Sequence, residues 1–219
     1  MNKTFLTKWG SEAYIKSNFL NEDELVQAKK FLDSINVESV EKVMTNHKFS
    51  ENNLYSSSFK KFCHEIEKKY EKQMQIILRE LVPHKASIPT RAFCTLSVLP
   101  PNCSYEVHED KLEKVLSGVI YLGKENIGTL IHNSKKDENP DEINWEENKI
   151  FVFSRQHNIS WHSYKSNENK RYTMILNLVT DNKFLHLKTE LNFLKAFYWF
   201  FIKNTMKYLR KLKNKILKK

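Results

Sequence analysis

Four residues between positions 108 and 171 could together hold a metal ion and an acidic ligand. His108 and Asp110 are separated by one residue, and His162 follows farther along the chain. Two imidazoles and one carboxylate on one face of a metal ion leave its other coordination positions open. Arg171 comes nine positions after His162, and its planar guanidinium can bind both oxygens of a carboxylate. The sequence therefore predicts a metal centre with an anion-binding arginine beside it.

The His-x-Asp pair alone is weak evidence for such a centre. With 8 histidines and 26 acidic residues, about one His-x-acid pair is expected by chance. Its context strengthens it, because the pair follows an expected strand and a Pro-Pro turn, where side chains converge at the rim of a sheet. His157 is an alternative distal ligand, since it also precedes the last expected strand. The spacing to Arg171 and the preceding Trp161 favour His162, while ordinary hydrogen-bonded or surface histidines are the alternative explanation.

The first third of the chain has helical periodicity. Within residues 18–33, Asn21 can cap a helix and Glu24 supplies the capping-box partner. Apolar residues recur every three or four positions over residues 58–81, with charges on the other face. We therefore expect two helices, the second ending before Pro83.

From residue 91 onward the pattern changes to short apolar segments separated by turns. The expected strands cover residues 92–99, 115–122, 129–131, 149–153 and 171–179. Helices followed by a run of short strands predict an α+β fold with a β-sandwich or barrel. A polar loop covers residues 133–142, and within it residues 135–142 are the segment of this part that we expect to be least ordered.

These motifs resemble the 2-oxoglutarate/Fe(II)-dependent dioxygenase superfamily, and within it the prolyl-hydroxylase-like branch. The matching pieces are residues 105–110 (YEVHED), 117–122 (SGVIYL), 128–130 (GTL), 150–153 (IFVF), 161–162 (WH) and 171–173 (RYT). The resemblance covers roughly residues 99–179 and implies a double-stranded β-helix, or jelly roll, as the core.

The resemblance also implies roles for individual residues. His108, Asp110 and His162 would be the catalytic ligands of Fe(II). Arg171 would bind the distal carboxylate of the co-substrate 2-oxoglutarate, assisted by Tyr121 and Thr173. Tyr105 would lie near the mouth of the metal site. Ascorbate is an auxiliary reductant that the resemblance allows.

The implied activity is hydroxylation of an unactivated C–H bond, with release of succinate and CO₂. A small molecule, a sugar or a peptidyl (prolyl-type) group would be the substrate. The hairpin reads Ile127-Gly128-Thr129, where many relatives have two glycines and an acidic residue. The substrate-side residues match no family pattern, so the resemblance does not indicate the substrate.

Three other functions compete with this interpretation. An AlkB-like nucleic-acid demethylase would carry a second arginine six positions after the first, where this chain has Asn177. A cupin-like metal-binding domain, acting as an isomerase or a binding module, would not turn over a 2-oxo acid. A non-catalytic module recruited through the C-terminal segment would not need the metal ligands.

The net charge of +10 is concentrated at the C-terminal end. Residues 183–219 contain ten Lys and one Arg against a single acid, Glu190, so the rest of the chain is formally neutral. We expect an oxygenase domain over residues 1–182, helical in 1–90 and β-rich in 91–182, followed by a basic amphipathic helix over 183–219. That helix could bind an anionic membrane surface or an acidic partner. Nucleic acid is disfavoured, because no recognition motif accompanies the charge.

Cysteine content and hydropathy bear on the compartment. The 3 cysteines are an odd number without a pairing pattern, which favours free thiols in a reducing environment. The first twenty residues lack the apolar core of a signal peptide. The longest strongly apolar run, 196–202, is far shorter than the roughly 20 residues that span a bilayer. These features predict a cytoplasmic protein, peripheral to a membrane if the basic segment binds lipid.

Overall fold

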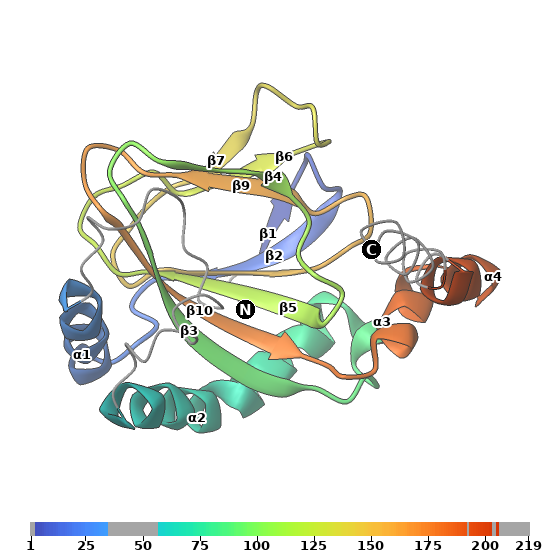
Figure 1. Cartoon of the computed structure of the whole chain (residues 1–219), viewed down its shortest axis with the longest axis horizontal. Coiled ribbons are helices and arrows are strands. Elements are labelled where there is room, and N and C mark those ends of the chain that lie inside the picture. Colours follow the sequence, from blue (N-terminus) through green and yellow to red (C-terminus); the bar gives the residue numbers. More distant parts are fainter. Residues whose placement is uncertain (1–2, 35–56, 192, 203–204, 206–219) are drawn as a thin grey trace, which may run out of the picture.

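Two antiparallel β-sheets face each other in the structure, a computed structural model that describes residues 3–34, 57–191, 193–202 and 205 (Figure 1). The large sheet has the order β1-β2-β8-β5-β10-β3, and the small sheet has the order β4-β9-β6-β7. The strands are β1 (Lys3–Leu6), β2 (Ser11–Lys16), β3 (Arg91–Leu99), β4 (Ser104–His108), β5 (Lys114–Tyr121), β6 (Thr129–His132), β7 (Asp141–Ile143), β8 (Ile150–Ser154), β9 (Trp161–Lys165) and β10 (Arg171–Val179). This double-sheet arrangement confirms the expected jelly-roll core.

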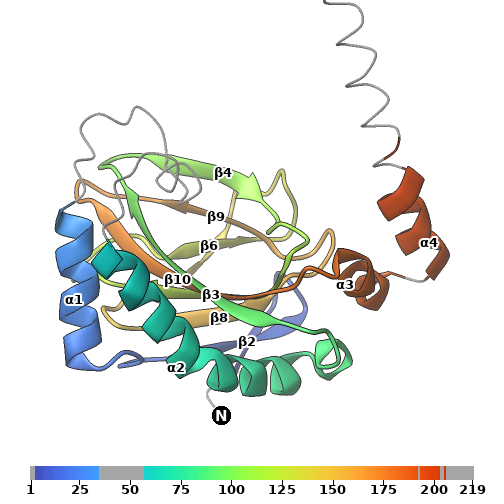
Figure 2. The ribbon, with the colours of Figure 1, turned by 60° about the horizontal axis from the view of Figure 1, so that its bottom comes forward.

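Two helices cover the outer face of the large sheet, α1 (Glu22–Asp33) and α2 (Ser57–Leu81) (Figure 2). Asn21 and Glu24 form the expected capping box at the start of α1. A 3-10 turn, Pro83–Lys85, follows α2, because proline cannot continue the helical hydrogen bonds. Both expected helices are thus confirmed.

Helix α2 lies against the sheet along one apolar stripe. Its buried positions fall on one face of the helix and are Phe59, Phe62, Cys63, Ile66, Tyr70, Met74, Ile77 and Leu78. Gly118 of β5 makes the close approach feasible. A Cβ at this position would lie 2.6 Å from the carbonyl oxygen of Leu176 and 3.2 Å from Cε of Met74. A larger residue there would push α2 away from the sheet.

Strands β5 and β8 supply side chains to two cores. Because successive side chains of a strand point to opposite faces, Ile150 and Val152 pack under the helices, while Phe151 and Phe153 face the small sheet. The inner core also contains Trp9, Ile131 and Ile143 among others. The central strands are therefore buried on both faces, which explains why they were readable from the sequence as continuous apolar runs.

Five strands were not predicted from the sequence, namely β1, β2, β4, β7 and β9. The N-terminal part, predicted as helical over residues 1–90, in fact begins with the β1–β2 hairpin. Strand β2 pairs with β8, with Tyr14 opposite Val152, so it extends the large sheet. Three of the four residues of β1 are exposed, which leaves little apolar pattern to recognise.

The polar loop at residues 133–142 makes specific contacts through Asp137. Lys8 forms an ion pair of 2.9 Å with the carboxylate of Asp137, and that carboxylate also accepts hydrogen bonds from the backbone of Asn133 and Asn139. The loop ends in β7, which pairs with β6. The ion pair with Lys8 is a long-range contact that no local pattern reveals.

The C-terminal segment is not the single helix that the sequence predicted. Helix α3 (Lys183–Glu190) ends at Leu191, whose backbone is extended (φ −128, ψ 158). A second helix, α4 (Phe193–Phe197), then leads into a π-helical turn, Tyr198–Ile202. Residues 206–219, over which the prediction continued, lie outside the described residues.

A buried ionic cluster explains why α3 ends where it does. The ammonium of Lys85 bonds to Glu190 at 2.8 Å and to the ring of His186 at 3.2 Å, and Arg155 pairs with the second carboxylate oxygen of Glu190. Although burial alone raises the pKa of Glu190, its hydrogen bond from His186 and the charges of Lys85 and Arg155 lower it to about 2. The last residue of α3 is therefore fixed against the domain.

Replacing Glu190 by glutamine is expected to lower the free energy of unfolding by about 3 kcal/mol at pH 7, because Lys85 and Arg155 would lose their buried counter-charge. The pKa of Glu190 falls from 4.5 to about 2 on folding. Its contribution is therefore complete above pH 4.5 and is lost as the pH drops toward 2. Urea unfolding of both proteins between pH 3 and 7 measures the difference.

Glu12→Gln is the matched control, because its ion pair with Lys3 is exposed and such pairs contribute about 0–1 kcal/mol. A difference for Glu190→Gln that stays constant with pH would contradict the assigned role of the Glu190 charge.

Two further expectations concern the whole chain. Cys63, Cys94 and Cys103 are all free in the structure, as the sequence predicted. Among the described residues, helices that combine the length and the apolar character needed to cross a bilayer are absent.

Candidate metal centre

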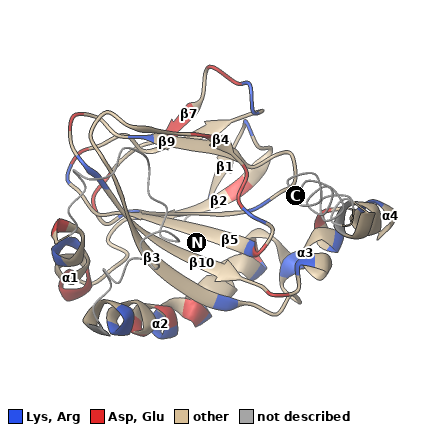
Figure 3. Ribbon diagram, in the orientation of Figure 1, with Lys and Arg blue, Asp and Glu red and all other residues tan. Residues whose placement is uncertain are grey.

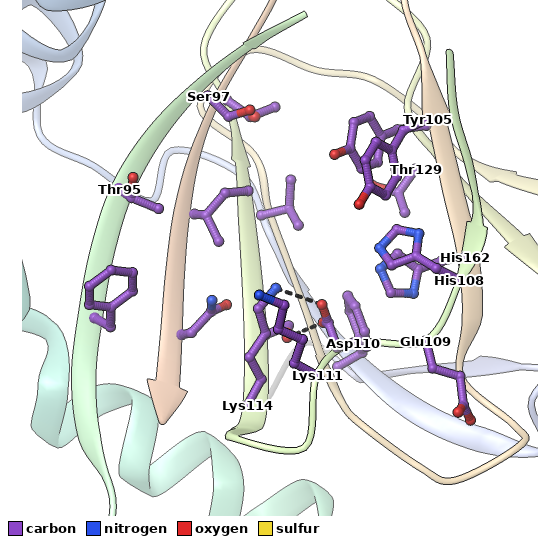
Figure 4. Close-up of a pocket in the computed structure, with 18 of the residues that line it drawn as sticks. Thr95, Ser97, Tyr105, His108, Glu109, Asp110, Lys111, Lys114, Thr129 and His162 are labelled. Carbon is purple, nitrogen blue, oxygen red and sulfur yellow. Dashed lines mark hydrogen bonds and ion pairs between the residues drawn. The ribbon is translucent and has the colours of Figure 1, made fainter. Parts of the chain in front are cut away.

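A cavity of about 300 Å³ lies between the two sheets. Its lining comes from the inner faces of β3, β5 and β10 on one side and from β4, β9 and the loop after β4 on the other (Figure 4). The lining residues include His108, Asp110, His162 and Arg171. The four residues singled out by the sequence therefore share one cavity.

Strand register places the two histidines side by side. His108 of β4 is the direct cross-strand partner of His162 of β9, and such partners have Cβ atoms about 5 Å apart on the same face. The ring centroids of the two imidazoles are 4.4 Å apart. Figure 4 shows them next to each other on the small-sheet side of the cavity.

Backbone hydrogen bonds fix which ring nitrogen of each histidine is available. Nδ1 of His108 lies 2.8 Å from the carbonyl oxygen of Glu106, and Nδ1 of His162 lies 2.9 Å from that of Ser160. A carbonyl only accepts, so each Nδ1 carries the proton and each Nε2 is left with a lone pair. This is the tautomer that a metal-binding imidazole needs.

Asp110 reaches the histidines from just beyond the end of β4. Lys114 bonds to Oδ1 at 2.6 Å and Ser117 of β5 bonds to Oδ2. Nε of Arg155 donates to the backbone carbonyl of Asp110 at 2.9 Å. The carboxylate is thereby oriented from the large sheet, and its remaining lone pairs are available to a metal ion.

The ligand atoms of His108, Asp110 and His162 all lie within 4.8 Å of one another. Burial lowers the pKa of His108 and lowers that of His162 to about 4. Burial raises the pKa of Asp110, but the charge of Lys114, the electrostatic interaction with the neighbouring His162 and the hydrogen bonds from Lys114 and Ser117 outweigh it, so the net shift is downward. At neutral pH the site therefore presents two neutral imidazoles and one carboxylate, the forms that bind metal.

The other histidines near the site take structural positions. Nδ1 of His157, the alternative distal ligand, lies 3.7 Å from a carboxylate oxygen of Glu109, and His157 is not in the three-residue cluster. His132 is buried and bonds through its two ring nitrogens to Asp137 and Ser163. The geometry thus favours His162 as the partner of His108.

Glu109 lies between His108 and Asp110 in the sequence but contacts the loop before β9. It points away from the histidines (Figure 4), but its side chain is only 14% exposed and lies 3.8 Å from Arg155. It also accepts a hydrogen bond from the backbone of Asn158. Glu109 therefore holds the loop before β9 next to the metal-binding residues.

Arg171, at the start of β10, is buried among aromatic rings. Its guanidinium carbon lies 5.8 Å from the ring centre of Tyr121, 5.3 Å from that of Trp145 and 5.0 Å from that of Tyr164. Its Nε donates to the carbonyl of Ile127 at 3.2 Å. No carboxylate in the described part of the chain forms an ion pair with it, so a buried cation in the cavity is left without a counter-ion.

The resemblance placed three further residues beside Arg171 and the metal, namely Tyr105, Tyr121 and Thr173. They occupy different positions in the structure. Thr173 and Tyr105 line the cavity, and Tyr105 stacks on Tyr164 with centroids 5.0 Å apart. Tyr121 is fully buried beneath the lining, where its hydroxyl bonds to Thr129 at 3.0 Å. Tyr121 thus supports Arg171 from below and is not itself part of the cavity wall.

Sequence reasoning missed several residues of the site. Lys114, Ser117, Tyr164 and Asn177 line the cavity, and Trp145 stacks on Tyr121 with centroids 4.4 Å apart. Lys114 stands four positions after Asp110, a spacing that could have signalled an ion pair. The others come from separate strands and loops and meet only in the folded jelly roll.

The hairpin before β6 depends on the glycine at position 128. A Cβ on Gly128 would lie 1.7 Å from the carbonyl oxygen of Ile143, so no other residue fits without moving β7. The backbone N–H of Gly128 donates to Glu142 at 2.8 Å. This contact sets the position of Thr129, which lines the cavity beside Arg171.

No protein-family model and no curated protein sequence matches the chain. Solved structures do resemble it. A prolyl-4-hydroxylase from Pseudomonas putida aligns with a TM-score of 0.51 at 10% identity, covering 78% of this chain and 93% of that one. A prolyl hydroxylase from Trichoplax adhaerens, in complex with a peptide fragment of hypoxia inducible factor, aligns with a TM-score of 0.51 at 12% identity, covering 81% and 86%.

The chain has the fold of the prolyl hydroxylases, a double-stranded β-helix with helices on one face. This confirms the fold that the sequence resemblance predicted. At 10% and 12% identity the likeness concerns the fold, so the chemistry must be argued from the residues of this chain.

Proposed function

We propose that the protein is an Fe(II)- and 2-oxoglutarate-dependent dioxygenase that hydroxylates an unactivated C–H bond and releases succinate and CO₂. The observation that carries the proposal is the pairing of two sites in one cavity. A cluster of His108, Asp110 and His162 lies in the same cavity as the buried Arg171, which has no ion-pair partner among the described residues. A metal ion and an anionic co-substrate could therefore be bound side by side.

The donor set fits Fe(II). His108 and His162 would offer their Nε2 atoms, and Asp110 would offer one carboxylate oxygen. Two nitrogens and one oxygen on one face of the ion form the arrangement found in non-haem Fe(II) oxygenases. When bound, the iron would supply the activation of O₂ and the oxidative decarboxylation of the co-substrate.

Arg171 fits a dicarboxylic co-substrate. A buried guanidinium without a counter-ion is costly unless a ligand neutralises it, and 2-oxoglutarate carries a carboxylate at each end. Burial lowers the pKa of Arg171, but arginine keeps its proton at neutral pH. Tyr121, Trp145 and Tyr164 would hold the guanidinium flat and exclude water, so that its fork faces the distal carboxylate.

The residues around the metal-binding cluster would position it. Lys114 and Ser117 would keep Asp110 ionised and oriented, and Arg155 would fix its backbone. Tyr105 and Tyr164 would form the wall between the cluster and Arg171. These roles are structural support for binding, and they require no proton transfer by the supporting side chains.

The side-chain amide of Asn177 favours a substrate that can donate a hydrogen bond. Asn177 is 2% exposed, lines the cavity, and its Oδ1 has no hydrogen-bond donor among the described residues. Its cross-strand neighbour Ser117 bonds to Asp110, so the amide lies at the metal end of the cavity. A substrate with an N–H or O–H group would satisfy it, which favours a peptidyl group or a sugar over a purely apolar molecule. The peptide bound to the Trichoplax adhaerens enzyme supports a peptidyl group as the substrate.

Incubation of the purified protein with Fe(II), 2-oxoglutarate and O₂ is expected to yield succinate, detected by NMR. A panel of peptides, amino acids and sugars should contain compounds that raise this rate. Metal analysis and binding of 2-oxoglutarate by calorimetry under anaerobic conditions provide readouts that do not depend on turnover. Metal binding without any binding or consumption of 2-oxoglutarate would contradict the proposal and favour the cupin-like alternative.

A further inference from the structure

The end of the described chain exposes a set of large apolar side chains, which we name the apolar patch. Its members and their exposed fractions are Phe193 (54%), Leu194 (77%), Phe197 (45%), Tyr198 (60%), Phe201 (46%) and Ile202 (44%). A single exposed apolar residue is ordinary, but a contiguous group on one short segment indicates an interaction site. In Figure 3 the described part of α4 is accordingly mostly uncharged.

Ring contacts join these side chains into one surface. Phe197 lies 6.3 Å from Phe193 and 4.8 Å from Phe201, measured between ring centres. Phe201 also lies 5.6 Å from Phe184 of α3. The apolar patch therefore continues onto α3, which is fixed to the domain by the buried cluster around Glu190.

Helix α4 does not bury this surface against the domain. A groove of about 430 Å³ separates it from the loop before β9, and Leu194 and Tyr198 line that groove opposite His157 and Asn158. Among the described side chains of residues 193–202, Ala196 is the buried one. Leu194, Phe197 and Tyr198 thus keep much of their surface exposed to solvent.

The charge next to the apolar patch has one sign. Residues 183–219 carry ten Lys and one Arg, and their single acid is Glu190, whose carboxylate is 3% exposed and is neutralised inside the domain. Lysines 203, 207, 211, 215 and 219 recur every four positions in the sequence. Nothing acidic in this segment is left to offset them.

We propose that the apolar patch and the basic residues that follow it bind a membrane surface containing anionic lipids. Apolar side chains enter the boundary between headgroups and acyl chains, while lysines contact acidic headgroups. Nucleic acid would satisfy the lysines and leave the apolar side chains exposed. A second copy of this chain would bring two segments of like charge together, which is unfavourable. The inference does not rest on the proposed enzymatic function.

The test is co-sedimentation of the full chain with vesicles of phosphatidylcholine alone or with a quarter of phosphatidylserine. At about 50 mM salt, binding to the anionic vesicles is expected to be at least tenfold tighter, and about 500 mM salt should weaken it because charge attraction is screened. Replacing the five evenly spaced lysines by glutamine should remove the preference for anionic vesicles.

The double variant Leu194→Ser/Phe197→Ser separates insertion from simple charge attraction. It leaves the charge unchanged and is expected to lower vesicle affinity at least tenfold. Val26→Ser/Ile76→Ser is the matched control, because Val26 and Ile76 are exposed apolar residues (58% and 45%) on α1 and α2. Circular dichroism checks that all variants are folded.

Four results would overturn the membrane proposal. The first is absence of binding to the anionic vesicles at low salt. The second is binding that the Leu194→Ser/Phe197→Ser variant retains in full. The third is tighter binding to RNA or polyglutamate than to vesicles. The fourth is self-association that the same variant abolishes, which would assign the apolar patch to a second copy of the chain.

Discussion

Asp110→Ala is expected to abolish stable Fe(II) binding and to reduce succinate formation to the background rate, while the fold remains intact. Asp110 is the only anion in the cluster of His108, Asp110 and His162, so its loss removes both a ligand and the charge that offsets the metal. Residues that merely orient a ligand contribute about 10–100-fold to metal affinity. A direct carboxylate ligand should contribute more than that.

The stability of the metal-free protein should change much less. Lys114 would lose its partner, but its side chain is 28% exposed and can reach water. The buried hydroxyl of Ser117 would lose one acceptor, at a cost of about 1–3 kcal/mol. Urea unfolding and circular dichroism measure this part, and anaerobic titration with Fe(II) or Co(II) measures metal affinity.

Glu106→Ala is the matched control for Asp110→Ala. It removes an exposed carboxylate from the same strand, two positions before His108, and keeps the backbone carbonyl that bonds to that histidine. Its metal affinity should equal that of the unchanged protein. If Asp110→Ala binds Fe(II) as tightly as this control, the carboxylate ligand lies elsewhere and the assignment is wrong.

The metal-binding residues could be found from the sequence because their residue types and their order are nearly sufficient to identify such a site. A His-x-Asp pair and a later histidine followed by an arginine can be recognised even where the strand boundaries are not known. Their geometry depends on register. His108 and His162 are opposed because β4 and β9 pair at that position, yet neither strand was predicted. Both are five residues long. Strand β4 alternates exposed with half-buried positions, and β9 ranges from exposed to buried, which leaves little apolar periodicity.

The surroundings of Arg171 could not be predicted for a different reason. Tyr164 comes from β9, Trp145 from the loop after β7, and Tyr121 from β5. Their contact with one guanidinium depends on both sheets closing on each other, so no spacing in the sequence encodes it. The same holds for the break between α3 and α4, which reflects the burial of Glu190 beside Lys85 and Arg155. Local periodicity predicted one continuous helix there.

Arg171→Lys is expected to weaken 2-oxoglutarate binding by roughly 10–100-fold with little change in Fe(II) affinity. A guanidinium can bind a carboxylate through two parallel hydrogen bonds, whereas an ammonium offers a compact point charge. Losing one charge-assisted hydrogen bond costs about 1.5–3 kcal/mol, which corresponds to that loss of affinity. Calorimetric titration of the Fe(II)-loaded protein without O₂ measures it directly.

Arg171→Lys would disturb the packing around the side chain as well as the geometry of its hydrogen bonds to a carboxylate. The flat guanidinium lies 5.0–5.8 Å from the centres of three aromatic rings, and its Nε holds the carbonyl of Ile127. Lysine is narrower and lacks the Nε donor, so Tyr121 and Trp145 would lose part of their contact surface. We therefore expect the maximal rate to fall as well as the affinity for 2-oxoglutarate.

Lys170→Arg is the matched control, since Lys170 is the exposed neighbour of Arg171 and the exchange between lysine and arginine is reversed. It should leave 2-oxoglutarate affinity unchanged. Unfolding in urea distinguishes a lost ligand contact from a damaged fold, because only the second lowers the free energy of unfolding by more than about 1–2 kcal/mol. If folded Arg171→Lys binds 2-oxoglutarate as tightly as the control, another cation anchors the distal carboxylate. Lys111 and Lys114, the remaining cations of the cavity lining, would then be the residues to change next.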